Sequence, residues 1–185
     1  MAAALLLIDV IGDFEFEGSE CLFPAALEAA PAIAEAARRA RAAEVPVVYV
    51  NDNYGEWRSD FRQIVERARQ GRGRVIAEQL LPREGDLFVL KPRNSGFHLT
   101  PLEALLAYLE VQTVVLAGFA CDLCVLFTAN DARTRGFDVA VLEDGVASER
   151  PEERDFALQL MKNKMHAQLI RSQDLDFSEL DRPRR

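Results

Sequence analysis

Short apolar segments alternate with longer helical patterns along the whole chain, and this alternation restricts the fold more than any other feature. Six segments are predicted strands: Leu5–Asp9, Val47–Asn51, Asp86–Lys91, Thr113–Ala117, Asp138–Leu142 and Ala167–Ile170. The predicted helices are Ala25–Ala43, Phe61–Gln70, Pro101–Glu110, Cys124 to about Arg135, and Pro151–Lys164. Apolar strands joined by helices are typical of a parallel sheet covered on both faces. We therefore predict a three-layer α/β/α fold around a six-stranded, mostly parallel sheet of the Rossmann-like type.

The length and composition indicate one compact domain. The 185 residues can bury a substantial core, and 49% of them are hydrophobic. We expect a single domain over residues 1–185. The 30 acidic and 22 basic residues give a formal net charge of -8, which argues against a nucleic-acid-binding protein because such proteins present a basic surface. A local basic cluster is interpreted as a solvated helix end and turn; it comprises Arg67, Arg69, Arg72 and Arg74.

The first ten residues, MAAALLLIDV, have an apolar run that is too short to cross a membrane and lack the basic start of a secretory signal. They read as a buried strand. Three cysteines without such a signal favour a reducing compartment. We expect a cytoplasmic protein that does not act at a membrane.

Chemically active residues follow the carboxyl ends of the first four predicted strands; in order these are Asp9, Asp52, Lys91 and Cys124. Parallel strands point their carboxyl ends to one edge of the sheet, where open α/β proteins bind ligands. A carboxylate beside a thiol can take its proton, and a lysine can hold the resulting anions. Asp9, Lys91 and Cys124 are therefore the candidate base, cation and nucleophile of a small-molecule site.

Cys124 lies in the segment Gly118–Asn130, GFACDLCVLFTAN, at or near the start of a predicted helix. The first turn of a helix carries a partial positive charge, which favours a thiolate over a thiol. Cysteine is also commonly buried as a small apolar group, so this segment alone does not decide between the two interpretations. The coincidence of Cys124 with Asp9 and Lys91 favours the nucleophile.

Three motifs in order resemble the isochorismatase-like cysteine hydrolases, a family that includes nicotinamidases and ureido and carbamoyl amidohydrolases. They are LLLIDVIGDF, which contains Asp9; LKPRNSGFHLTPLEALL, which contains Lys91; and AGFACDLCVLFTANDARTRGFDVAVLEDGVAS, which contains Cys124. The resemblance implies that these three residues are the catalytic aspartate, lysine and cysteine. It covers nearly the whole chain, from about Ala4 to Ile170.

The resemblance implies further properties. The peptide bond between Phe119 and Ala120 is expected to be cis, and the N–H groups of Ala120 and Cys124 are expected to form an oxyanion hole. The implied activity is cleavage of a C–N bond in a small amide, carbamoyl or ureido compound through a thioester. A homo-oligomer is also implied.

The chain departs from the nicotinamidases of that family at the position of their metal. Those enzymes bind it through an Asp-x-His pair and a later His, whereas Asp52 is followed here by Asn53 and Tyr54. The chain has two histidines, His98 and His166, and these do not supply the roughly three protein ligands that a transition-metal site needs. We expect no metal and no other cofactor, and nicotinamide is disfavoured as substrate.

The segment Asn53–Phe61 is predicted to be the specificity loop. The candidate substrate-binding residues are Phe14, Asp52, Tyr54, Trp57 and Phe97. Aromatic side chains among them favour a partly apolar pocket.

Three other functions remain open. An isochorismatase-type vinyl-ether hydrolase would use the aspartate to protonate carbon and would need no nucleophile. Cys121 and Cys124 have the CxxC spacing of redox proteins, although such motifs belong near the first βα unit. A non-catalytic binding homologue would have an inert Cys124.

Overall fold

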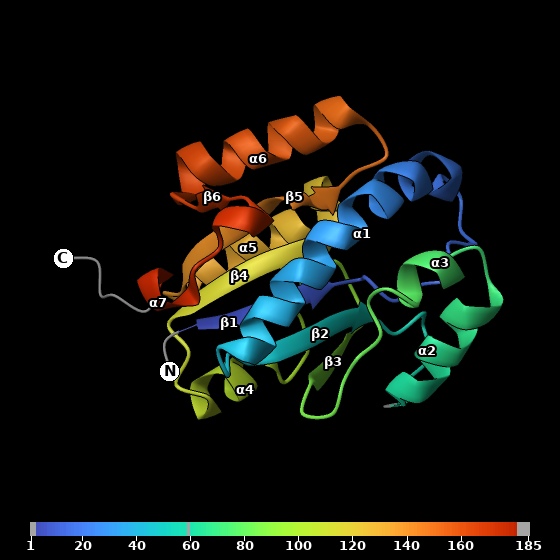
Figure 1. Ribbon diagram of the computed structural model, residues 1–185, viewed down its shortest axis with the longest axis horizontal. Helices are drawn as coiled ribbons and strands as arrows, with labels where there is room; N and C mark the ends of the chain where they lie inside the picture. Colours follow the sequence, from blue (N-terminus) through green and yellow to red (C-terminus); the bar gives the residue numbers. More distant parts are fainter. Residues whose placement is uncertain (1–2, 59, 181–185) are drawn as a thin grey trace.

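A computed structural model of the protein describes residues 3–58 and 60–180. Its six strands are β1 Ala3–Ile8, β2 Val47–Asp52, β3 Leu87–Lys91, β4 Thr113–Phe119, β5 Asp138–Ala147 and β6 Gln168–Ile170. They form one sheet in the order β3-β2-β1-β4-β5-β6, and the five pairings between neighbouring strands are all parallel (Figure 1). The predicted α/β fold with a six-stranded parallel sheet is confirmed.

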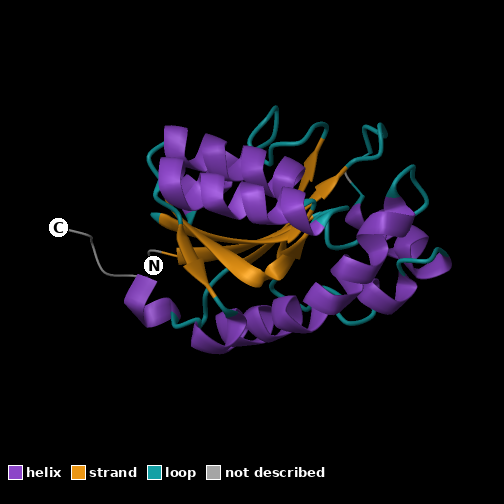
Figure 2. Cartoon of the chain, turned by 90° about the horizontal axis from the view of Figure 1, so that it is seen from above, coloured by secondary structure: helices purple, strands orange, loops and turns teal. Residues whose placement is uncertain are grey.

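Helices cover both faces of the sheet, which gives the three predicted layers (Figure 2). One face packs against α1 Ser19–Ala42, α2 Phe61–Gln70, α3 Arg74–Ala77 and α7 Phe177–Leu180. The other packs against α4 Leu102–Tyr108, α5 Leu126–Thr134 and α6 Pro151–Met165. A π-helical turn, η1 Cys121–Val125, precedes α5, and a 3₁₀ turn, η2 Ser172–Asp174, follows β6. Among the helices described, none has the length and apolar character needed to cross a bilayer.

The central strand β1 shows why the strands are apolar without interruption. Its side chains alternate between the two faces because the period of a strand is two residues. Leu5 and Leu7 belong to the core beneath α1, and Leu6 and Ile8 belong to the core beneath α4–α6. All four side chains are fully buried. The sheet therefore separates two apolar cores, as expected for a parallel sheet with both faces covered.

Two elements extend by five or more residues beyond their predicted bounds. The helix α1 begins at Ser19 instead of Ala25 and contains Pro24. Pro24 lies close to the start of the helix and removes one backbone donor, while Leu22 buries its side chain in the core and holds this first part against the sheet. The strand β5 continues past the predicted end at Leu142 because its pairing with β4 resumes after a register shift.

Gly118 lets β4 pass close to β1 at the edge where the strands end. Its φ is +125°, and a Cβ atom there would lie 2.0 Å from the carbonyl oxygen of Ile8. No other residue type fits this approach, because the contact is with backbone that the β1–β4 pairing holds in place. Ile8 and Gly118 are paired directly before Asp9 and Phe119, so this contact sets the spacing between two segments of the site.

Candidate active site

The carboxyl ends of four adjacent strands meet at one edge of the sheet. Asp9 follows β1, Asp52 ends β2, Lys91 ends β3 and Ala120 follows β4. The strand order reverses between β1 and β4, because the chain continues to β2 on one side and to β5 on the other. Ligands in open α/β sheets bind at such a reversal. The predicted placement of the candidate residues at this edge agrees with the structure.

Lys91 lies at the centre of this group with its side chain completely buried. Its Nζ is 2.7 Å from Oδ2 of Asp9 and 3.5 Å from Sγ of Cys124. Oδ2 of Asp52 is farther away, at 3.8 Å. A buried ammonium is costly unless it is paired and hydrogen-bonded. The burial of Lys91 therefore depends on Asp9 and on the sulfur of Cys124.

Asp9 is held from two sides. Its Oδ1 accepts a hydrogen bond of 2.6 Å from the backbone N–H of Asp52, while Oδ2 faces Lys91. The carboxylate is also close enough to the thiol of Cys124 for each group to affect the pKa of the other. Asp9 has a φ of +53°, a conformation that Asp tolerates better than most residues. This turn directly after β1 places the carboxylate between the lysine and the thiol.

The proton equilibria of the three groups are coupled. Burial raises the pKa of Asp9, and Lys91 opposes that shift. Burial and the Asp9 carboxylate raise the pKa of Cys124 to about 12, although Lys91 opposes the rise. Burial acts to lower the pKa of Lys91, but the charges of Asp9 and Cys124 prevail and raise it. Asp9 and Cys124 therefore do not titrate independently, and both do so beside the Lys91 ammonium.

The expectation that the helix start stabilises a resting thiolate is consequently wrong. Cys124 lies inside the π-helical turn Cys121–Val125, and the partly buried thiol is next to a carboxylate. Desolvation and the neighbouring Asp9 carboxylate together outweigh the opposing effect of Lys91 on the pKa of Cys124. The thiol of Cys124 is therefore protonated near neutral pH.

The two cysteines of the turn point into different surroundings. Cys121 is completely buried in the core beneath α4–α6. Its sulfur lies 3.9 Å from the carbonyl oxygen of Arg154, and burial raises its pKa to about 12. Both cysteines are free thiols. A buried thiol with a raised pKa is a poor redox partner, so the geometry disfavours the CxxC interpretation.

A pocket of about 440 Å³ opens over Cys124. Three of the predicted substrate-binding residues line it, namely Phe14, Asp52 and Tyr54. The predicted cis peptide between Phe119 and Ala120 is present, and both residues line the same pocket. The remaining lining residues are Asp9, Gly12, Phe16, Glu17, Leu22, Leu123 and Glu149. Most of this wall is apolar, as in many small-molecule sites.

The other two predicted substrate-binding residues lie outside this pocket. Phe97 is a core residue that packs against Phe137, with the guanidinium of Arg135 5.0 Å from its ring centre. Trp57 is 78% exposed and borders a neighbouring depression with His98. Asp52 lines both spaces. The sequence pattern marked aromatic residues near the site but gave no direction for their side chains.

The basic cluster contributes to the site in a way that the sequence analysis missed. Arg67 forms an ion pair with the buried Asp13 and lies over the ring of Tyr54, 4.5 Å from its centre. The N–H of Gly73 donates to the carbonyl oxygen of Asp13. A Cβ atom on Gly73 would collide with the carbonyl oxygen of Gly12, at 1.8 Å. These contacts hold the segment after β1 against α2 and α3.

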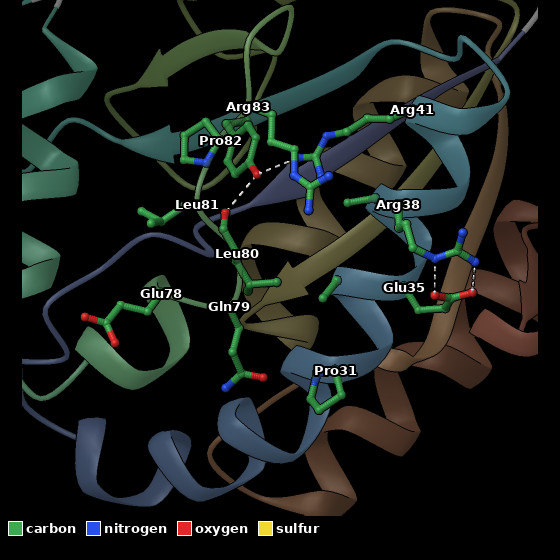
Figure 3. Close-up of a pocket in the computed structure, with 13 residues that line it drawn as sticks. Pro31, Glu35, Arg38, Arg41, Glu78, Gln79, Leu80, Leu81, Pro82 and Arg83 are labelled. Atoms are coloured by element: carbon green, nitrogen blue, oxygen red, sulfur yellow. Dashed lines mark hydrogen bonds and ion pairs between the residues drawn. The ribbon is translucent and has the colours of Figure 1, made fainter.

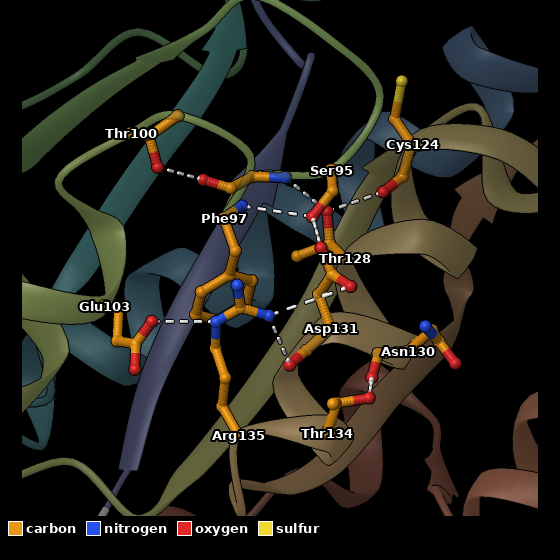
Figure 4. A network of polar contacts seen from close by, with 11 residues as sticks. Ser95, Phe97, Thr100, Glu103, Cys124, Thr128, Asn130, Asp131, Thr134 and Arg135 are labelled. Atoms are coloured by element: carbon orange, nitrogen blue, oxygen red, sulfur yellow. Dashed lines mark hydrogen bonds and ion pairs between the residues drawn. The ribbon is translucent and has the colours of Figure 1, made fainter.

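A polar network joins the loop after Lys91 to the helix after Cys124 (Figure 4). The hydroxyl of Thr128 donates to the carbonyl oxygen of Cys124 at 2.7 Å and accepts from the N–H of Gly96 at 3.0 Å. The hydroxyl of Ser95 donates to Asp131 at 2.6 Å. The network therefore ties the chain segment that carries the lysine to the one that carries the thiol.

The residues around Asp52 do not fit a metal ion. Oδ1 of Asp52 accepts a hydrogen bond of 2.6 Å from the N–H of Tyr54, and its Oδ2 faces Lys91. Tyr54 occupies the position of the first histidine in the nicotinamidase pattern. Within residues 3–58 and 60–180, no group of three His, Cys, Asp or Glu side chains is placed to hold a metal ion.

A second cavity of about 560 Å³ lies between α1 and the segment after α3, far along the chain from Cys124 (Figure 3). Arg41 pairs with Asp86 at 2.8 Å and also donates to the hydroxyl of Tyr49. Tyr49 donates to the carbonyl oxygen of Leu80. Among its described lining residues there is no cysteine or serine. The polar groups here bind one another, and no nucleophile is present.

The comparison with known protein families agrees with this geometry. A sequence model of the isochorismatase domain matches residues 3–174. The chain belongs to the isochorismatase family. It is a hydrolase of that family, with the expected aspartate, lysine and cysteine grouped at one edge of the sheet.

Relatives with several activities resemble this family member. An isochorismatase family protein, YaaI of Bacillus subtilis, is 36% identical over 93% of the chain and 95% of that protein. The ureidoacrylate amidohydrolase RutB of Methylobacterium radiotolerans is 30% identical over 65% of the chain and 55% of the enzyme. The structure of N-carbamoylsarcosine amidase from Thermoplasma acidophilum superposes with a TM-score of 0.73 and 28% identity, over 95% of this chain and 99% of that one.

Proposed function

We propose that the protein is a metal-independent cysteine amidohydrolase that cleaves the C–N bond of a small amide, carbamoyl or ureido compound. The observation that carries the proposal is the position of the Lys91 ammonium, 2.7 Å from Asp9 and 3.5 Å from the sulfur of Cys124. This arrangement places a base and a nucleophile around one buried cation. The amidohydrolase and amidase named among its relatives support the same class of reaction.

In the first half of the reaction, the substrate carbonyl carbon lies over the sulfur of Cys124. Asp9 accepts the thiol proton as the sulfur attacks, so that negative charge moves to the substrate oxygen. The backbone N–H groups of Ala120 and Cys124 are the proposed donors to this oxyanion. Lys91 keeps its proton and stabilises whichever of its two neighbours is negative.

Collapse of the tetrahedral intermediate breaks the C–N bond. Asp9 gives its proton to the leaving nitrogen, which departs as ammonia or an amine, and the acyl group stays on Cys124 as a thioester. Asp9, now a carboxylate again, takes a proton from a water molecule that attacks the thioester. Breakdown of the second intermediate releases the acid or carbamate, and the cysteine recovers a proton from Asp9.

The raised pKa values suit this cycle. A carboxylate whose pKa lies above the ordinary value is a stronger base toward the thiol. A thiol that stays protonated at neutral pH provides the proton that the leaving nitrogen needs. A vinyl-ether hydrolase would use Asp9 alone and would give no role to the contact between Lys91 and Cys124.

The proposal is tested by trapping the acyl group. The enzyme is quenched with acid during turnover of a panel of primary amides, N-carbamoyl and ureido compounds, and its cysteine peptides are analysed by mass spectrometry. We expect the acyl mass on the peptide that contains Cys124 and its removal by hydroxylamine. Cys121→Ser is the matched control and should retain turnover. Hydrolysis that continues at the native rate in Cys124→Ala would contradict the thioester mechanism.

A further inference from the structure

More carboxylates line the pocket over Cys124 than the proposed reaction uses. Asp9 is paired with Lys91, but Glu17 and Glu149 also line the pocket and belong to its exposed edge. Asp52 lines it as well, with 41% of its side chain exposed. Because Asp52 also faces Lys91, the further negative charge comes from Glu17 and Glu149, which form an acidic edge of the pocket.

Glu149 is positioned by the start of a long helix. A Cβ atom on Gly18 would lie only 2.5 Å from Oε1 of Glu149, so the carboxylate of Glu149 is in contact with this glycine. Gly18 has a φ of +85° and precedes the first turn of α1, a helix of 24 residues. The amino end of a helix carries partial positive charge, which attracts a carboxylate. Glu149 therefore lies beside the amino end of α1, at the edge of the pocket.

Aromatic rings form part of the wall of the same pocket. Phe14 is central, with its ring centre 6.1 Å from that of Phe16 and 6.2 Å from that of Phe119. All three line the pocket. The faces of such rings attract cations, most strongly where water is excluded.

Positive groups do not balance this lining. Among the described residues that line the pocket, none is Lys, Arg or His. Lys91 is completely buried behind Asp9 and Cys124. Arg67 is paired with Asp13 and covers the ring of Tyr54. A carboxylate on a substrate would meet like charges there and no free cation, whereas an ammonium group would meet carboxylates and ring faces.

We propose that the pocket selects amides whose non-reacting end carries a cationic ammonium group on an apolar stem, and that it rejects amides that carry a carboxylate. This inference rests on the proposed amidohydrolase function. It separates the chain from its relative named for ureidoacrylate, whose substrate is an anion. The acidic edge supplies the selection, and the aromatic wall accommodates the stem.

The charge preference is tested first without any substrate, by the reaction of Cys124 with three alkyl methanethiosulfonates that differ in charge. The probes carry a trimethylammonium-ethyl, a sulfonato-ethyl or a methyl group, and each reacts when the thiolate displaces methanesulfinate to form a disulfide. Rates at Cys124 are followed by peptide mass spectrometry and divided by the rates with 2-mercaptoethanol. We expect the cationic probe to exceed the anionic probe by about tenfold or more at low ionic strength.

Two double variants separate the local edge from the overall charge. Glu17→Gln with Glu149→Gln removes the acidic edge, and Glu20→Gln with Glu28→Gln removes two exposed carboxylates that do not line this pocket. The first variant should reduce the rate ratio of the cationic to the anionic probe to about one, the value expected without a charge preference. The matched variant should keep most of the native ratio. A native ratio at or below one, or equal ratios in the two variants, would overturn the proposal.

A second arm uses three para-substituted benzamides that bear an aminomethyl, an ethyl or a carboxymethyl group. The expected order of acyl transfer to Cys124 is aminomethyl, then ethyl, then carboxymethyl. Faster transfer from the carboxymethyl compound would reject the charge preference and leave the amidohydrolase function standing. A cation-favouring thiosulfonate ratio without an acyl adduct from these or any other amides would reject the proposed function while the acidic edge remained demonstrated.

Discussion

The cavity between α1 and the segment after α3 and the pocket over Cys124 contain similar groups with different consequences. Each has a buried or partly buried ion pair and aromatic side chains. In the first, Arg41 and Asp86 are 2.8 Å apart, and Arg41 also binds Tyr49. In the second, Lys91 is paired with Asp9 and also touches the sulfur of Cys124.

The two ion pairs differ in whether they also act on a reactive group. Arg41 donates to both oxygens of Asp86, at 2.8 and 3.1 Å, so the charges satisfy each other. The Asp9–Lys91 pair also holds a thiol whose proton it can take, and the thiol opens into a pocket. A cavity with charged residues becomes a candidate active site only where those charges act on a reactive atom.

The largest expected effect comes from removing the cation from each of the two ion pairs in turn. Lys91→Met should lower kcat/KM by about 10⁴-fold or more and cost about 3–5 kcal/mol of unfolding free energy, because Asp9 is left unpaired in the interior. Arg41→Met should cost about 1–3 kcal/mol through Asp86 and leave kcat/KM of the folded enzyme unchanged. Denaturant unfolding and steady-state kinetics measure both quantities. An equal loss of activity in the two variants would break the comparison.

Asp9→Asn separates the base from the charge that surrounds the thiol. Hydrolysis should fall by about 10²–10⁴-fold because no carboxylate accepts the thiol proton. The pKa of Cys124 should nevertheless fall, since the Asp9 charge raises it and Lys91 remains. Iodoacetamide should therefore modify Cys124 faster at pH 8 in this variant than in the native protein.

The control for this variant is Asp138→Asn, which removes a carboxylate at the start of β5, on the opposite edge of the sheet. It should leave both hydrolysis and alkylation unchanged. Slower alkylation of Cys124 in Asp9→Asn would mean that the carboxylate promotes ionisation of the resting thiol, contrary to the coupling described.

The pH dependence of kcat/KM follows from the same coupling. The reaction needs Asp9 ionised and Cys124 protonated, and both pKa values are raised. Activity should therefore be lost as pH falls through the pKa of Asp9, above the ordinary aspartate value of 3.8. No alkaline loss due to Cys124 should occur until the pH approaches about 12. An acid limb at or below 3.8 in the pH profile would contradict the raised pKa of Asp9.

The smallest predicted effect concerns the network in Figure 4. Thr128→Val removes the hydroxyl that binds the carbonyl oxygen of Cys124 and the N–H of Gly96. We expect a loss of about 1 kcal/mol in stability and a several-fold decrease in kcat, because the thiol and Lys91 lose part of their common support. Thr128→Ser keeps the hydroxyl and should restore kcat. A native kcat in Thr128→Val, or a loss in Thr128→Ser as large as in Thr128→Val, would contradict the role assigned to the hydroxyl hydrogen bonds.

Much of the fold was predictable because its signals are local. Six apolar runs at strand length, separated by helical patterns, require a parallel sheet with two covered faces, and the structure has that sheet. The first part of α1 was missed because Pro24 resembles a helix boundary, and the burial of Leu22 outweighs that local preference. The extension of β5 depends on pairing with β4, which is also a tertiary effect.

The site divides in the same way. Asp9, Lys91 and Cys124 follow strand ends, so their meeting at one edge was predictable from the order of the elements. The direction of Phe97 into the core and the exposure of Trp57 depend on neighbours distant in sequence. The local sequence around Phe97 and Trp57 has no periodic pattern that would indicate these neighbours.

The sequence alone determined which strand ends carry an acid, a cation and a thiol, because a parallel topology brings those ends together. Only the tertiary structure decided their electrical state. The complete burial of Lys91, the hydrogen bonds of Asp9 and the raised pKa of Cys124 depend on how closely the chain surrounds them. The acidic edge was decided in the same way, since Glu17 and Glu149 meet only after α1 and the segment following β5 have packed together. The strength of an interaction between charges depends on their distance and on their desolvation, and both are properties of the folded chain.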